Sequence, residues 1–162
     1  MALRGTLGGG FGAHARRLAP RVGEWVALTR TFAPADVAAF ADLTGDTNPL
    51  HRSGSGGGGG GALGAAPAVH GILLAGLFST AFGVSYPGCV YREQSLVFRR
   101  PAPVGDPVTA VLRVSRVREL RRGALIVSCD TEVALGAEGD EVAVDGVAEV
   151  FLPGGTYDGE SR

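Results

Sequence analysis

The segment from Gly71 to Val84 constrains the fold more than any other part of the chain, because it is apolar on nearly every side. Its large side chains are relieved only by small ones, and Tyr86-Pro87-Gly88 follows as a stop signal. A helix without a polar face needs a protein interior. The segment is shorter than the roughly 18–20 residues that a membrane helix requires. We therefore expect a buried helix, not a membrane span, and other elements of the chain must surround it.

The sequence that follows this helix is typical of β-structure. Apolar residues alternate with polar ones in several runs, and turn signals rich in glycine, proline and aspartate separate the runs. The expected strands are Cys89 to Phe98, 108–114, 125–133 and 142–152. Long strands joined by short turns pair antiparallel, and their apolar face must be covered. The pattern predicts an α+β hot-dog fold, in which an antiparallel sheet is wrapped around one long buried helix.

The N-terminal half adds a strand, a helix and a polar loop. Trp25 to Phe32 reads as a short strand. Pro34 suits the first turn of a helix and Gly45 suits its end. Between them lies an apolar stripe at helical spacing, made of Val37, Phe40, Ala41 and Leu43. The run Ser53 to Gly61 contains only glycine and serine after the loop, so we expect no helix there.

Composition narrows the class of protein. The net charge of -1 gives none of the basic excess that nucleic-acid binding needs. The two cysteines form neither a disulfide framework nor a metal-ligand spacing. All 15 basic residues are arginine. Five of them gather between Arg113 and Arg122, where they form either a solvated hairpin tip or a docking patch for phosphate groups or an acidic protein.

The ends of the chain differ from its middle. The first acidic residue is Glu24, and the preceding segment carries arginines but no acid, which is typical of a mitochondrial transit segment; a plain disordered tail is the alternative. The sequence predicts a transit segment over residues 1–22, one hot-dog domain over 23–153 and a disordered tail over 154–162. The expected location is the mitochondrial matrix.

Two short motifs carry the chemistry. Asp46, Asn48 and His51 place a carboxylate, an amide and an imidazole in one proline-stiffened loop, which can hold an acid and a base close together. His70 and Gly71 open the apolar helix, and His70 taken by itself is expected to be structural, either bonding the loop or capping the helix. The first N–H groups of a helix have no internal partners and carry the positive end of its dipole, so they can bind a developing oxyanion. Gly71 has no side chain to obstruct a carbonyl.

These motifs resemble the MaoC-like (R)-specific hydratase family. The resemblance rests on Gly-Asp-x-Asn-Pro-x-His, then His-Gly before an apolar helix, and then the segments Pro87 to Phe98 and Pro101 to Val108. It covers about residues 23–152. Within the family, the chain is most similar to the short mitochondrial 3-hydroxyacyl-thioester dehydratases of type 2.

The resemblance implies an activity and a set of roles. Asp46 and His51 would be the catalytic pair, Asn48 would help to fix them, and Gly71 would polarise the thioester carbonyl with His70 beside it. The reaction would be the reversible dehydration of a (3R)-hydroxyacyl thioester of coenzyme A or acyl carrier protein to a trans-2-enoyl thioester, in mitochondrial fatty acid synthesis. The family acts as homodimers without a metal or an organic cofactor. A thioesterase and a non-catalytic acyl-binding module are the alternative functions.

Overall fold

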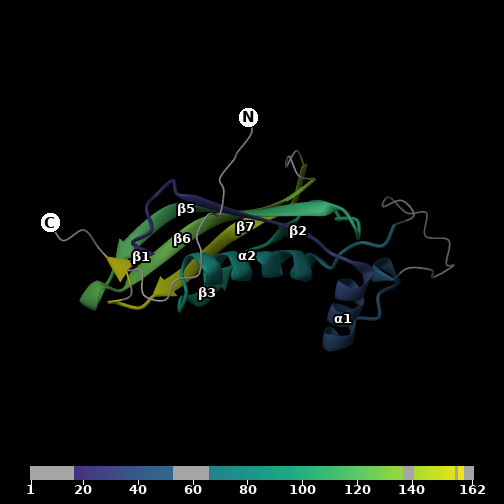
Figure 1. Cartoon of the computed structure of the whole chain (residues 1–162), viewed down its shortest axis with the longest axis horizontal. Coiled ribbons are helices and arrows are strands. Elements are labelled where there is room, and N and C mark those ends of the chain that lie inside the picture. Colours follow the sequence, from purple (N-terminus) through teal and green to yellow (C-terminus); the bar gives the residue numbers. More distant parts are fainter. Residues whose placement is uncertain (1–16, 53–65, 137–140, 156, 159–162) are drawn as a thin grey trace.

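The computed structural model describes residues 17–52, 66–136, 141–155 and 157–158. The predicted non-helical run Ser53 to Gly61, and most of the predicted transit segment, lie outside these residues. In the described part, a twisted antiparallel sheet covers one long helix (Figure 1).

The sheet has the strand order β2-β5-β6-β7-β3, and β4 also pairs with β7. Its strands are β2 (Trp25–Thr31), β3 (Val90–Gln94), β4 (Val97–Phe98), β5 (Pro107–Glu119), β6 (Leu125–Leu135) and β7 (Glu141–Leu152). All the pairs in this sheet are antiparallel. The segment expected as one strand from Cys89 to Phe98 is thus divided between β3 and β4.

Helix α2 (Gly71–Ser85) lies against this sheet and confirms the predicted hot-dog fold. Its inner side chains Leu74, Leu77, Phe78, Ala81 and Phe82 are buried. The alternating residues of β5 meet them from the sheet, as the sequence pattern predicted: Val108, Ala110, Leu112 and Val114. The helix is not buried all round, however, because the sheet covers only one of its sides. Ile72 stays 57% exposed and Val84 50% exposed.

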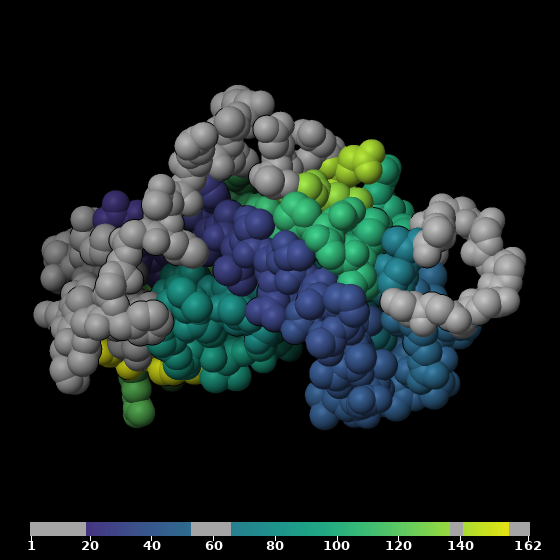
Figure 2. Space-filling view, turned by 45° about the vertical axis from the view of Figure 1, so that its right-hand side comes forward, coloured from purple at the N-terminus to yellow at the C-terminus, as the bar shows by residue number. Residues whose placement is uncertain are grey.

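Helix α1 (Pro34–Thr44) projects from one end of the sheet, as Figure 2 shows at the lower right. Its predicted boundaries are confirmed: Pro34 opens it, and Gly45 ends it with a left-handed φ of 73°. Of the predicted apolar stripe, Val37 and Ala41 are buried, whereas Leu43 is 84% exposed. Leu43 therefore does not contribute to the core, because α1 packs on the body through only part of the expected stripe.

Backbone hydrogen bonds join three distant segments at this end of the molecule. The Ala68 N–H donates to the Leu50 carbonyl at 3.0 Å, and the Val69 N–H donates to the Ala102 carbonyl at 2.8 Å. Ala68 also forms a bridge with Pro103. The strand-like segment before α2 is therefore fixed between the polar loop after α1 and the turn before β5.

The opposite end holds a second, two-stranded sheet and a hairpin tip. Strand β1 (Arg17–Leu18) pairs in parallel with β8 (Tyr157–Asp158), so residues on both sides of the predicted domain are paired. The domain boundaries at 23 and 153 stay a prediction. The hairpin between β5 and β6 carries the 3₁₀ turn η2 (Arg121–Gly123). Within the described ranges, each helix falls short of the length and apolar character that crossing a membrane demands.

Candidate active site

The loop after α1 is held by its own side chains. The Asn48 N–H donates to Asp46 Oδ1 at 2.8 Å, and the Leu50 N–H donates to Asn48 Oδ1 at 3.1 Å. Asn48 thereby caps the 3₁₀ turn η1 (Pro49–His51). The first residue of this turn is proline, which has no backbone N–H that would need an acceptor. These bonds leave Asp46 Oδ2 available. Asp46, Asn48 and His51 are thus brought together as the sequence predicted, with Asn48 acting on the turn.

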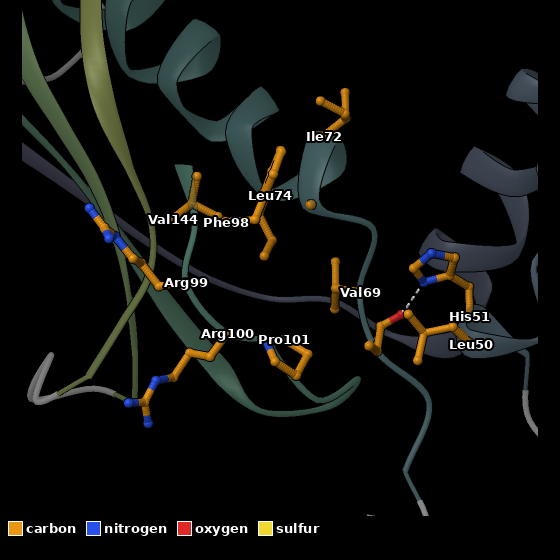
Figure 3. Close-up of a pocket in the computed structure, with 12 residues that line it drawn as sticks. Leu50, His51, Val69, Ile72, Leu74, Phe98, Arg99, Arg100, Pro101 and Val144 are labelled. Atoms are coloured by element: carbon orange, nitrogen blue, oxygen red, sulfur yellow. Dashed lines mark hydrogen bonds between the residues drawn. The ribbon is translucent and has the colours of Figure 1, made fainter. Parts of the chain in front are cut away.

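The His51 ring has a defined proton position. Its Nδ1 lies 2.7 Å from the Ala68 carbonyl oxygen. A carbonyl oxygen can only accept, so Nδ1 carries the proton and donates it. In the neutral ring, the lone pair is then on Nε2, which points away from the backbone. The side chain is only 12% exposed. The bond to Ala68 thus makes His51 a base that presents Nε2, as Figure 3 shows with its dashed line.

His70 lies directly on His51. The two rings stack at a centroid distance of 3.7 Å with 23° between their planes. Asp46 Oδ2 lies 3.9 Å from His51 Nε2 and 3.5 Å from His70 Nε2. Both distances exceed the usual range of a hydrogen bond. One carboxylate oxygen therefore faces two imidazoles across a gap that no hydrogen bond closes.

His70 is buried, and its surroundings favour the neutral form of its ring. It is 4% exposed, and its pKa is lowered by burial and by the neighbouring His51, while Asp46 acts in the opposite direction. It occupies the position before α2, but its side chain does not cap the helix. The sequence suggested a capping or loop-bonding role for it. Instead, the structure places its ring between Phe40, at 4.9 Å, and His51.

Gly71 begins α2 beside this cluster. The Leu74 N–H donates to the His70 carbonyl, so the first amide of the helix, at Gly71, precedes its hydrogen-bond ladder. A Cβ at Gly71 would lie 2.5 Å from Cε1 of Phe98. The ring of Phe98 therefore requires glycine here as it is placed. This proximity of Phe98 was not evident from the sequence, because 26 residues of chain separate the two positions.

A pocket of about 480 Å³ opens next to His51 and Gly71 (Figure 3). Its lining is mostly apolar and includes Leu50, Val69, Ile72, Leu74, Phe98, Pro101 and Val144. Arg99 and Arg100 also line it, but their guanidinium groups bind Asp145 and Glu141. In Figure 3 both arginine side chains point away from His51. The pocket can hold an apolar chain whose head reaches the imidazole and the helix N-terminus.

The predicted basic run does not border this pocket. Pro107 at the start of β5 lies near the site end of the sheet, and Arg121 follows the other end of that strand. Thirteen residues of strand span roughly 40 Å at about 3.3 Å each. Figure 1 accordingly shows the hairpin and α1 at opposite ends. Within one chain, the structure thus favours the solvated hairpin tip over a docking patch for the same site.

Comparison with known proteins gives consistent matches over most of the chain. The family model described as "MaoC like domain" matches residues 19–134. An (R)-specific enoyl-CoA hydratase of Aeromonas caviae is 40% identical over 134 residues, which cover 82% of this chain and 95% of that protein. A mitochondrial 3-hydroxyacyl-[acyl-carrier-protein] dehydratase of Arabidopsis thaliana is 31% identical over 143 residues, covering 88% and 84%.

A solved structure agrees with these sequence matches. The (R)-hydratase from A. caviae involved in PHA biosynthesis superposes with a TM-score of 0.73 at 39% identity, covering 83% of this chain and 98% of that chain.

Proposed function

The chain belongs to the MaoC-like domain family, and from that premise we propose that it is a hydro-lyase that interconverts (3R)-3-hydroxyacyl thioesters and trans-2-enoyl thioesters. The observation that carries this proposal is that His51 and Gly71 line one apolar pocket, while Asp46 Oδ2 lies 3.9 Å from the His51 Nε2 atom that the bond to Ala68 leaves with its lone pair. These three groups supply a base, a hydrogen-bond acceptor and a hydrogen-bond donor to the oxyanion.

The hydrogen bond from the Gly71 N–H to the thioester oxygen lowers the barrier to removal of the C2 proton. That proton is weakly acidic unless the enolate charge on the thioester oxygen is stabilised. Gly71 lines the pocket at the N-terminus of α2, and its N–H together with the helix dipole would supply this stabilisation. Preorganised donors of this kind usually contribute the largest single share of a rate enhancement.

His51 and Asp46 divide the proton transfers. His51 Nε2 takes the proton from C2, and the electron pair of the C–H bond delocalises onto the thioester oxygen as an enolate. Asp46 Oδ2, which lies 3.9 Å from His51 Nε2, accepts a hydrogen bond from the 3-hydroxyl and orients it toward His51. The imidazolium then returns its proton to the hydroxyl as the enolate collapses, so that the C2–C3 double bond forms, the C3–O bond breaks and water leaves. The protein ends in its starting protonation state, and hydration follows the same steps in reverse.

The apolar lining of the pocket fits the acyl chain. Leu74 and Val144 are buried at its floor, and Phe98 forms a wall beside Gly71. The thioester carrier, either coenzyme A or acyl carrier protein, would then extend toward the solvent. We place the reaction in mitochondrial fatty acid synthesis. Support comes from plant relatives named as mitochondrial and from the acid-free, arginine-bearing residues 1–22.

A homodimer is part of this proposal. The sheet has open edges at β2 and at β3 with β4, and open edges pair readily with another chain. The second edge carries the exposed apolar residues Val90, Val97 and Phe98. The outer face of α2, with Ile72 and Val84, is also exposed; part of this helix reaches the surface in Figure 2. A monomeric mass at micromolar concentration with full activity would contradict the dimer.

Loss of enoyl absorbance on incubation with crotonyl-CoA tests the activity. We expect hydration to the (3R)-hydroxy product without release of free thiol. The same assay with crotonyl acyl carrier protein decides between the two carriers. Thiol release would indicate a thioesterase instead. Binding of crotonyl-CoA without turnover by a correctly folded protein would indicate the non-catalytic module and end the hydro-lyase proposal.

A further inference from the structure

Among the described residues, His70 is unusual in the surroundings of its ring nitrogens. Its ring is buried, yet neither Nδ1 nor Nε2 has a hydrogen-bond partner. A buried polar group left unpaired costs roughly 1–3 kcal/mol, and such a group calls for a water, an ion or a role in catalysis. The catalytic proposal uses His51, Asp46 and Gly71 and leaves the lone pair of His70 without a function.

Three ligand atoms converge at this point. One atom each from Asp46, His51 and His70 lies within 4.8 Å of the other two. The side chains come from the loop after α1 and from the residue before α2, and the bond from the Ala68 N–H to the Leu50 carbonyl joins these two segments. The separation of 3.5 Å between Asp46 Oδ2 and His70 Nε2 already matches the roughly 3.4 Å between two ligands of a tetrahedral zinc ion.

His51 shows the orientation of a metal ligand. Metal-binding histidines almost always donate their other ring N–H to a carbonyl or carboxylate, which fixes the ring and the tautomer. Here the Nδ1–H donates to the Ala68 carbonyl at 2.7 Å and leaves Nε2 facing Asp46 and His70. A small inward rotation of this ring would complete the triangle, because its Nε2 is 3.9 Å from Asp46 Oδ2.

We propose that Asp46, His51 and His70 bind a divalent transition cation of the zinc class, and that the bound ion reversibly inhibits the chain. Two imidazole nitrogens and one carboxylate oxygen are a zinc-type donor set, which leaves the fourth position of a tetrahedral ion to a water molecule. Magnesium and calcium prefer all-oxygen ligands and do not fit it. Inhibition follows because the metal occupies the same Nε2 lone pair with which His51 removes the C2 proton.

The binding test uses the full chain and Zn²⁺, followed by calorimetry and by the visible absorption of Co²⁺ as a spectroscopic substitute. We expect one ion per chain, and no binding of Mg²⁺ at the same concentration. His51→Ala and His70→Gln should each weaken Zn²⁺ binding at least tenfold. The chain has three histidines, and His14 lies outside the described residues. His14→Gln is therefore the matched control and should bind as the wild type does.

The outcomes separate the site from other zinc ligands. If His51→Ala and His70→Gln bound Zn²⁺ as tightly as the wild type, or if His14→Gln abolished binding, the ion would sit elsewhere and the proposal would fail. Asp46→Asn covers the case in which a histidine variant does not fold, since Asp46 is partly exposed and its side chain keeps its shape. It too should lose affinity and change the Co²⁺ spectrum.

The inhibition test rests on the proposed function, whereas the binding test does not. Zn²⁺ equimolar with the protein should suppress hydration of crotonyl-CoA, a chelator should restore it, and His14→Gln should be inhibited equally. Binding at this site without inhibition would overturn the inhibitory part. A metal-free protein without hydratase activity would refute the hydro-lyase proposal, and calorimetry would still decide whether the three side chains hold the ion.

Discussion

The core between the sheet and α2 differs from the candidate active site in whether its buried polar side chain is hydrogen-bonded. Among the described residues, the buried polar side chains are Thr131 in the core and His70 at the site. The Thr131 hydroxyl oxygen accepts a hydrogen bond from Gln94 Nε2 at 3.1 Å. Both ring nitrogens of His70 lack a partner. The core thus satisfies its polar atom, while the site keeps lone pairs open, because reacting groups and ligands need unoccupied donors and acceptors.

The two regions also differ in how they are held. Alternating side chains of β5, β6 and β7 fill one apolar layer against α2. The site end depends on a few backbone bonds, such as those of Ala68 and Val69, and on short turns. Core substitutions should therefore reduce stability, whereas site substitutions should reduce activity with little loss of fold. The five predictions below test this division, starting with the largest expected effect.

Phe78→Ala should have the largest effect of all, on stability. Phe78 is fully buried between α2 and the sheet, and removing such a ring typically costs about 3–5 kcal/mol. Urea unfolding followed by circular dichroism measures the loss. Ser79→Ala, one position further on the exposed side of α2, is the control and should stay within about 0.5 kcal/mol. Equal stability of the two variants would remove the distinction between core and surface.

His51→Ala and Asp46→Asn should each lower kcat/KM for crotonyl-CoA hydration at least ~100-fold, or about 2.7 kcal/mol of transition-state stabilisation. Their melting temperatures should stay near that of the wild type. Because the two side chains act on one substrate, the double variant should be little worse than the poorer single variant. If both single variants kept the wild-type rate with the fold intact, His51 and Asp46 would have no catalytic role and would serve only to shape the turn.

Gly71→Ala should reduce kcat/KM roughly tenfold, less than the 10²–10³-fold loss on removing an oxyanion donor outright. The amide remains, but the new methyl group would collide with the Phe98 ring, which lies 2.5 Å from its position. Phe98→Leu in the same chain relieves this clash and should recover part of the rate. A double variant no faster than Gly71→Ala alone would show that the ring is not the cause.

Alkaline pH should destabilise the core through Cys129. Its pKa is raised from 9.0 to about 12, first by burial and then by the negative charges of Asp130 and Glu24. Above pH 9 the unfolded chain loses the thiol proton while the folded chain keeps it, so stability falls as pH rises toward 12. By pH 10 the loss is roughly 1 kcal/mol. Cys129→Ala should be less stable at pH 7 but show a flatter alkaline decline in thermal melts.

The smallest expected effect on stability concerns the exposed side of helix α1. Leu43→Ala should change stability by less than about 0.5 kcal/mol, because Leu43 is 84% exposed. Val37→Ala on the same helix should cost about 2 kcal/mol, because Val37 is 2% exposed and its removal leaves a small cavity. A large effect at Leu43 would mean that another surface covers it in the assembled protein.

The sequence by itself determined the features that arise from short-range physics. A segment apolar on nearly every side identified α2, and apolar alternation identified the strands that cover it, because burial requires matching apolar faces. The Asp46 to His51 loop was equally predictable. Its geometry comes from Gly45, Pro49 and side-chain bonds that span two residues. Such contacts depend only on residue type and spacing, both of which the sequence states directly.

The contacts of the site outside that loop were decided by the tertiary structure alone. His70 stacks on His51 because Ala68 and Val69 are fixed between Leu50 and Ala102. Phe98 lies over Gly71, and Leu43 faces away from the body, for similar reasons of packing. No periodicity encodes these contacts, since each joins segments that approach only when the sheet closes on α2. The orphaned imidazole and the three-ligand cluster therefore exist only in the folded chain.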